Sequence, residues 1–177
     1  MRYQPVIGLE IHCELLTGSK VSCTCRNEFG GSENTRVCPR CSGMPGTLLL
    51  LNQGAVKLAA KAGFATNCTV HNYSAFDRKN YFYPDLPKAY QITQFEHPIC
   101  TDGYIDVAGG KRIRINRLHM EEDAGKLVHD DYEGVSLADY NRCGVPLIEI
   151  VTEPDFRSVA EVQDFVTQIA QRLKYSG

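Results

Sequence analysis

Three separate segments of the sequence place carboxylates and imidazoles where strands would present them to one site. Glu10 and His12 lie two residues apart in an alternating segment, so a strand would turn both side chains to the same face. A second segment ends in His119-Met120-Glu121-Glu122-Asp123, and a third carries Glu149 inside an apolar run. A carboxylate buried in an apolar strand loses several kcal/mol of hydration unless a cation compensates its charge. These segments therefore predict a shared cation site.

The ligand types indicate which cation this would be. Oxygen-rich sets with one imidazole suit Mg²⁺ or Mn²⁺ better than zinc. The alternative is that Glu149 faces water at a strand edge and that residues 121–123 form a solvated turn, because spacing alone does not bring the segments together. The neighbouring Cys13 is a poor nucleophile for His12, since adjacent residues of a strand point to opposite faces.

A second set of candidate ligands lies in the polar, glycine-rich loop of residues 17–46. Two close cysteine pairs, Cys23 with Cys25 and Cys38 with Cys41, supply four thiolates suited to a tetrahedral zinc ion. Such a site has no open position, so we predict a structural zinc that orders a loop with few apolar residues. The alternative is four free cysteines, with one redox pair among them. The remaining cysteines lie in apolar contexts and are predicted to be buried thiols: Cys13, Cys68, Cys100 and Cys143.

Alternating apolar and polar residues indicate the strands that would position these side chains. We predict strands at residues 4–13 and 145–151, and a hairpin of residues 99–105 and 112–118 around Gly109-Gly110. Residues 72–98, rich in aromatics and prolines, predict a long ordered loop or short strands.

Two helices complete the expected fold. Asn52 is the predicted N-cap of the first, and Ser158 with Glu161 forms a capping box for the last. The first helix would present a small-residue face of Val56, Ala59, Ala60 and Gly63; the last would present an apolar stripe of Val162, Phe165, Val166, Ile169 and Leu173. The sequence therefore predicts an α+β fold, with a mixed or antiparallel sheet and helices.

Composition sets broad limits on function. The 177 residues, 43% of them hydrophobic, suit one domain or one large piece of a longer chain. A formal net charge of -2 gives no global attraction to nucleic acid. We find no signal peptide and no run long enough to span a bilayer, so we expect a cytoplasmic protein without disulfides. The last helical pattern is followed closely by Gly177, from which we expect truncation.

Five long strings make the sequence similar to the B subunits of the aspartyl/glutamyl-tRNA amidotransferases. They are VIGLEIHCEL (6–15), CPRCSGMPGTLLLLN (38–52), FDRKNYFYPDLPKAYQIT (76–93), LHMEEDAGKL (118–127) and DYNRCGVPLIEIVTEPD (139–155). The resemblance covers essentially the whole chain. It departs from the family pattern at Ala89, where glycine is usual, at Met120 and at Cys143, and none of these removes a proposed ligand.

The resemblance implies a fold related to the glutamine synthetase catalytic core. Residues 1–177 would be the first part of a catalytic cradle domain carrying the zinc-binding loop at 17–46, without the family's C-terminal helical and tail domains. The implied enzyme is an ATP-dependent ligase that phosphorylates the side-chain carboxylate of misacylated Glu-tRNA(Gln) or Asp-tRNA(Asn). Ammonia from the partner amidase, the A subunit, then displaces the phosphate, and the small C subunit braces the complex.

The resemblance also implies residue roles. His12, Glu122 and Glu149 would hold one Mg²⁺, while Glu10 and Glu121 would hold a second ion or orient the ammonia. Lys79 and Arg142 would contact phosphate or carboxylate groups. No Walker-type loop or G-x-G-x-x-G motif appears, so ATP would bind through metal and side chains. The alternative function is a zinc-stabilised RNA- or protein-binding module without catalysis.

Overall fold

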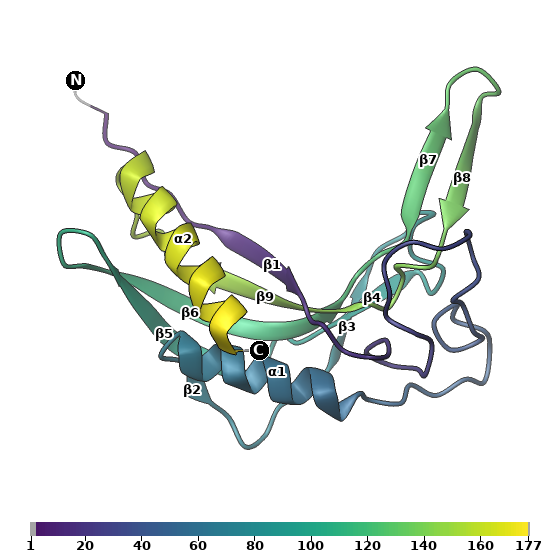
Figure 1. Ribbon diagram of the computed structural model, residues 1–177, viewed down its shortest axis with the longest axis horizontal. Coiled ribbons are helices and arrows are strands. Elements are labelled where there is room, and N and C mark those ends of the chain that lie inside the picture. Colours follow the sequence, from purple (N-terminus) through teal and green to yellow (C-terminus); the bar gives the residue numbers. More distant parts are fainter. Residues whose placement is uncertain (1–2, 177) are drawn as a thin grey trace.

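A five-stranded antiparallel sheet forms the centre of the computed structural model, which describes residues 3–176. Its strand order is β1-β9-β6-β5-β2, so β9 lies between the first strand and the long strand β6 (Figure 1). The strands are β1 (Glu10–Glu14), β2 (Thr69–Val70), β5 (Cys100–Val107), β6 (Lys111–Glu122) and β9 (Pro146–Thr152). The predicted α+β class is confirmed, and every strand pairing within residues 3–176 is antiparallel.

Two helices supply the other half of the hydrophobic core. They are α1 (Gln53–Ala65) and α2 (Val159–Ser176). One face of the sheet packs on them, and Ile148 and Ile150 of β9 share one buried hydrophobic cluster with Phe165 and Ile169 of α2. Because a strand alternates its side chains, burying this face leaves the residues between them on the opposite face. That opposite face carries the acids and imidazoles.

Two smaller hairpins flank the sheet. The first joins β3 (Asp77–Asn80) to β4 (Tyr90–Thr93), and the second joins β7 (Lys126–Asp130) to β8 (Val135–Asp139). The first lies beside the end of β6, where Gln94 accepts a hydrogen bond from the Met120 amide at 3.0 Å. The second projects away from the sheet (Figure 1).

A β-bulge in β6 decides which of its residues reach the open face. The pairing of β6 with β9 shifts register between Ile115 and Arg117. Before the shift, the buried core residues have odd numbers, as in Ile113 and Ile115; after it they have even numbers, as in Leu118 and Met120. The extra residue therefore turns Arg117, and the alternate residues that follow it, out of the core.

The helix signals in the sequence correspond to real caps. The Asn52 side chain accepts the Gly54 amide at 2.8 Å, as expected of an N-cap. Ser158 accepts the Glu161 amide at 3.3 Å, but the Glu161 carboxylate accepts the Arg157 amide rather than that of Ser158, so the capping box is half formed. The small face of α1 is Ala55, Ala59, Ala62 and Gly63, rotated slightly from the predicted one.

Other boundaries differ from the prediction. The segment predicted as a strand at 4–13 becomes regular only at Glu10, because its partner β9 ends at Thr152 and Pro154 follows; Ile7 makes a single bridge to Phe156. The predicted hairpin and the strand near residue 145 are confirmed, and residues 72–98 contain the short strands β3 and β4. Neither helix in residues 3–176 is long and apolar enough to cross a membrane.

The core of α2 gives a test of this packing. Phe165 is fully buried and meets Phe156 edge to face at 5.2 Å between ring centroids. We expect Phe165→Ala to lower the free energy of unfolding by about 3–5 kcal/mol, because it removes the ring and leaves a cavity. The adjacent Val166 is 43% exposed, so Val166→Ala should cost only about 1 kcal/mol. Chemical denaturation of both variants checks this; equal losses would contradict the described face of α2.

Candidate functional site

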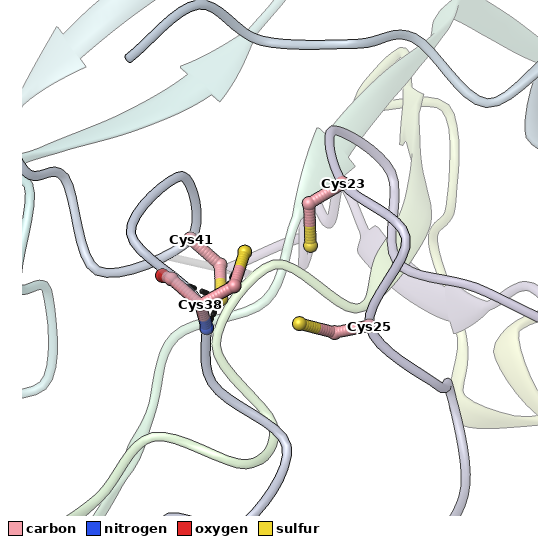
Figure 2. A group of neighbouring side chains, drawn as sticks. All are labelled: Cys23, Cys25, Cys38 and Cys41. Carbon is pink, nitrogen blue, oxygen red and sulfur yellow. Dashed lines mark hydrogen bonds between the residues drawn. The ribbon is translucent and has the colours of Figure 1, made fainter. Parts of the chain in front are cut away.

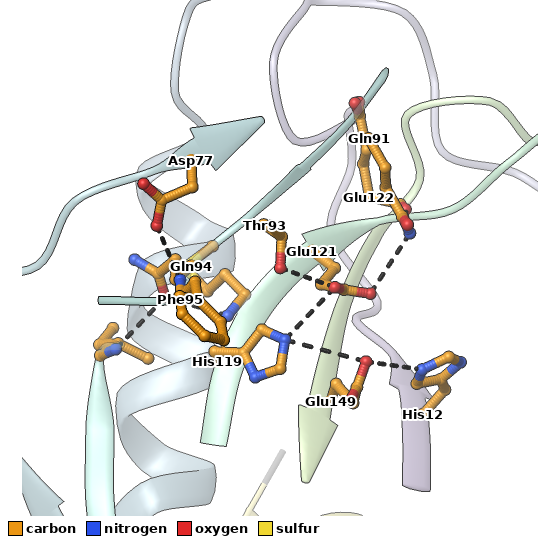
Figure 3. Close-up of polar contacts among 12 residues, drawn as sticks. His12, Asp77, Gln91, Thr93, Gln94, Phe95, His119, Glu121, Glu122 and Glu149 are labelled. Carbon is orange, nitrogen blue, oxygen red and sulfur yellow. Dashed lines mark hydrogen bonds and ion pairs between the residues drawn. The ribbon is translucent and has the colours of Figure 1, made fainter. Parts of the chain in front are cut away.

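The open face of the sheet brings three of the predicted site residues together. Glu149 of β9 is paired across the sheet with His12 of β1 on one side and with His119 of β6 on the other. Glu121 lies two residues beyond His119 and therefore shares its face. Figure 3 shows Glu149 between the two imidazoles, with Glu121 above His119.

The distances make this group a compact set of donors. His12 Nε2 lies 3.1 Å from Glu149 Oε2, and His119 Nε2 lies 3.3 Å from Glu121 Oε1 and 3.8 Å from Glu149 Oε2. One ligand atom each from His12, Glu121 and Glu149 lie within 4.8 Å of one another. Two carboxylate oxygens and an imidazole at this spacing fit the donor set that Mg²⁺ or Mn²⁺ takes.

Burial makes the carboxylates of this site unusual. The side chains of Glu121 and Glu149 are 2% and 9% exposed, whereas that of His12 is 57% exposed. Burial raises the pKa of Glu121, but hydrogen bonds from His119 and from the Thr93 hydroxyl outweigh it, and the pKa stays below its usual value. The site therefore holds Glu121 as an ionised carboxylate, ready to bind a cation.

The structure groups Glu121, rather than Glu122, with His12 and Glu149. Glu122 lies on the opposite face of β6, where its buried carboxylate forms an ion pair with the buried ammonium of Lys88 and accepts the Ile92 amide at 3.0 Å. The structure therefore does not bring the predicted set of His12, Glu122 and Glu149 together, because consecutive strand residues point to opposite faces. The alternation of a strand indicates this from the sequence. Glu121 is two residues from His119 and shares its face, whereas Glu122 shares a face with the apolar Leu118 and Met120.

A pocket of about 510 Å³ opens beside these residues. Its walls combine the carboxylates with three cationic side chains: Arg78 and Lys79 from β3, and Arg117 from β6. Glu10 also lines it but is exposed and stands outside the compact donor set. The predicted Lys79 is therefore at the pocket, while Arg117 was missed by the sequence reasoning.

Arg142, the other predicted anion contact, is placed elsewhere. Its guanidinium donates to the carbonyl oxygens of Ala124 and Gly125 at 3.0 and 2.9 Å and pairs with Asp123 at 3.3 Å. It does not line the pocket. The guanidinium thus braces the turn that follows β6.

The four cysteines of the 17–46 loop also converge (Figure 2), and their sulfurs lie within 4.8 Å of one another. Cys38 Sγ and Cys41 Sγ are 3.8 Å apart, which matches the sulfur–sulfur edge of about 3.8 Å expected around a tetrahedral ion with Zn–S bonds of about 2.3 Å. Cys23 and Cys25 face this pair from the neighbouring turn. The geometry suits a four-thiolate metal centre.

A buried lysine supplies positive charge beside these sulfurs. Lys20 is 0% exposed, and its ammonium lies 3.8 Å from Cys41 Sγ and donates to the Tyr140 carbonyl at 3.3 Å. A hydrogen bond from Cys23 first, then the Cys38 amide and the Lys20 charge, lower the pKa of Cys41 to about 4 despite burial. Cys41 is therefore a thiolate, the form that binds metal.

The other predicted thiols lie outside the group of four, although Cys143 Sγ donates to the carbonyl oxygen of Cys41 at 3.5 Å. Cys68, Cys100 and Cys143 are buried, as expected, whereas Cys13 is only half-buried. Burial raises the pKa of Cys100 and of Cys143 to about 12, so both remain neutral thiols. Cys68 and Cys100 act as small apolar side chains in the hydrophobic core.

Comparisons with known proteins agree with the resemblance read from the sequence. The family described as the GatB/GatE catalytic domain matches residues 5–177. The B subunit of the aspartyl/glutamyl-tRNA(Asn/Gln) amidotransferase of Ruminiclostridium cellulolyticum is 60% identical over 180 residues, covering 100% of this chain and 37% of that protein. Its counterpart from Caldicellulosiruptor saccharolyticus is 59% identical over 180 residues, covering 100% of this chain and 38% of its own length. The chain thus spans less than two fifths of these relatives, and it belongs to the family of the GatB/GatE catalytic domain.

Proposed function

We propose that this chain carries the phosphorylating site of an ATP-dependent amidotransferase acting on misacylated Glu-tRNA(Gln) or Asp-tRNA(Asn). The observation that carries the proposal is the convergence of His12, Glu121 and Glu149 on one face of the sheet, with both carboxylates buried. The names of the relatives, which are B subunits of aspartyl/glutamyl-tRNA(Asn/Gln) amidotransferases, indicate the substrate class.

The proposed reaction has two balanced steps. The side-chain carboxylate of the aminoacyl group attacks the γ-phosphorus of ATP, ADP leaves, and an acyl phosphate forms. Ammonia then attacks the carbonyl carbon, phosphate leaves with the electrons of the C–O bond, and the nitrogen loses a proton to give the amide. Both steps develop charge on phosphoryl oxygens, which cationic groups must offset.

We assign a different role in this reaction to each residue of the site. His12, Glu121 and Glu149 would hold Mg²⁺, which, when bound, neutralises charge on the transferring phosphoryl group. His119 hydrogen-bonds the Glu121 carboxylate through Nε2 at 3.3 Å and lies 3.8 Å from the Glu149 carboxylate, so it helps to position both. Lys79 faces the same pocket and contacts phosphate oxygens, while Glu10 is left to bind a second ion or to orient the ammonia.

The rest of the proposal, which concerns the fold, the zinc and the partners, is based on membership of the family. The sheet and helices would be part of a glutamine synthetase-like catalytic cradle, with the cysteine cluster holding a structural zinc. The partners would be the amidase A subunit, which releases ammonia from glutamine, the small C subunit, and the misacylated tRNA. Such an enzyme works in the cytoplasm, where aminoacyl-tRNA is made and used.

The proposal is tested by Glu149→Gln, which keeps the shape of the side chain and removes its charge. In the assembled amidotransferase we expect ATP-dependent amidation to fall by at least about 100-fold, because a charge aimed at the transition state is lost. Glutaminase activity of the partner amidase should be unchanged. The measurement is amide formation on aminoacyl-tRNA, with glutamate release measured in parallel.

Glu133→Gln provides the matched control for this variant. Glu133 is exposed in the turn between β7 and β8, away from the pocket, and should leave both activities unchanged. Normal amidation by Glu149→Gln, with weakened assembly of the complex, would instead support a zinc-stabilised RNA- or protein-binding module.

The cysteine cluster gives a second prediction. Metal analysis of the purified chain should find about one zinc per molecule, and Cys25→Ser should reduce this content and lower the melting temperature, since the loop is ordered by its ligands. Cys13→Ser, at a half-buried thiol outside the cluster, should keep the zinc. A folded wild-type chain without zinc would exclude the site.

A further inference from the structure

Arg117 differs from its neighbours along β6: like Arg78 and Lys79 of the same pocket, it forms no ion pair within residues 3–176. Arg112 pairs with Asp106 at 2.8 Å, and Arg114 pairs with Asp155 at 2.8 Å. The Arg117 guanidinium makes no ion pair with any of residues 3–176, and the only side-chain hydrogen bond it donates there is a long one of 3.5 Å from Nη1 to Asn116 Oδ1.

The burial of Arg117 makes this lack of a partner costly. The residue is half-buried, and its Nε atom is buried without a hydrogen-bond acceptor in the described part of the chain. A guanidinium is always charged and carries five donors in a fixed fork. A buried donor left without an acceptor is destabilising, so its position is explained best by a ligand that supplies oxygen atoms.

The position of Arg117 on the sheet indicates where that ligand lies. Arg117 pairs across the sheet with Val151, which pairs in turn with Glu10, and Arg117 and Glu10 form no ion pair with each other. The next row on the same face of the sheet, two residues further along the strands, is that of His119, Glu149 and His12. Arg117 thus stands one row from the cation-binding group, on the wall of the same pocket.

We propose that Arg117 is a substrate-binding residue whose guanidinium holds phosphoryl oxygens of the nucleotide, beside the cation held by His12, Glu121 and Glu149. The inference rests on the function proposed above. A planar fork binds two oxygens of one phosphoryl group at once, which a lysine does not reproduce. Arg78 is less suited to this role because its guanidinium stacks on the Tyr90 ring, 4.5 Å from the centroid.

The test compares Arg117→Gln and Arg117→Lys with Arg112→Gln in the assembled enzyme. We expect Arg117→Gln to raise the KM for ATP by about 10- to 100-fold, as for loss of a charged hydrogen bond, and to weaken inhibition by inorganic phosphate in parallel. Arg117→Lys keeps the charge but not the fork and should fall between it and the wild type. Arg112→Gln, an exposed ion-pair partner outside this pocket, should change the KM by less than about twofold.

Three outcomes would overturn the inference. An unchanged KM for ATP in folded Arg117→Gln removes it while leaving the proposed function intact, and Arg117→Lys provides the same test if the glutamine variant does not fold. A raised KM for aminoacyl-tRNA alone assigns the guanidinium to the substrate carboxylate instead. A wild-type complex that performs no ATP-dependent amidation removes the proposed function and this inference together.

Discussion

Two carboxylates held almost out of solvent, those of Glu121 and Glu149, are the constraint on which the rest of the open face depends. Glu121 and Glu149 cannot remain charged there without compensation, because an isolated buried charge is strongly destabilising. His119 and His12 provide part of that compensation within the described residues, at 3.1–3.8 Å. A divalent cation held as proposed above would provide the remainder, because its charge would offset that of the two buried carboxylates.

A second buried polar cluster links the cysteine loop to the end of β6. Lys20 contacts Cys41, and Lys88 pairs with Glu122. Gly144 lies between these two pairs, because a Cβ atom added there would come within 3.5–3.7 Å of Lys20, Cys41 and Glu122. The loop therefore packs against the residue next to Glu121. Order in the cysteine loop and order in the carboxylate site are physically connected through these side chains.

The sequence predicted the local features well and the long-range ones less well. Alternation placed Glu10 and His12 on one face, and the cap at Asn52 is real, because these signals depend on neighbours in the chain. The pairing of Lys88 with Glu122 joins residues far apart in sequence, so no local pattern indicates it. The hairpin of β7 and β8 was missed because most of its residues are exposed on both faces, which removes the alternation that identifies a strand.

The β-bulge at Asn116 fixes which residues of β6 face the hydrophobic core and which face the acids. Deleting one residue between Ile115 and Arg117 would leave every amino-acid type downstream unchanged, yet it would exchange the two faces of the strand. His119 would turn into the aliphatic interior, and Met120 would turn toward the acids of β9. Chain length at this point is therefore as strictly constrained as the identity of the acidic side chains themselves, although Asn116 takes no part in the chemistry.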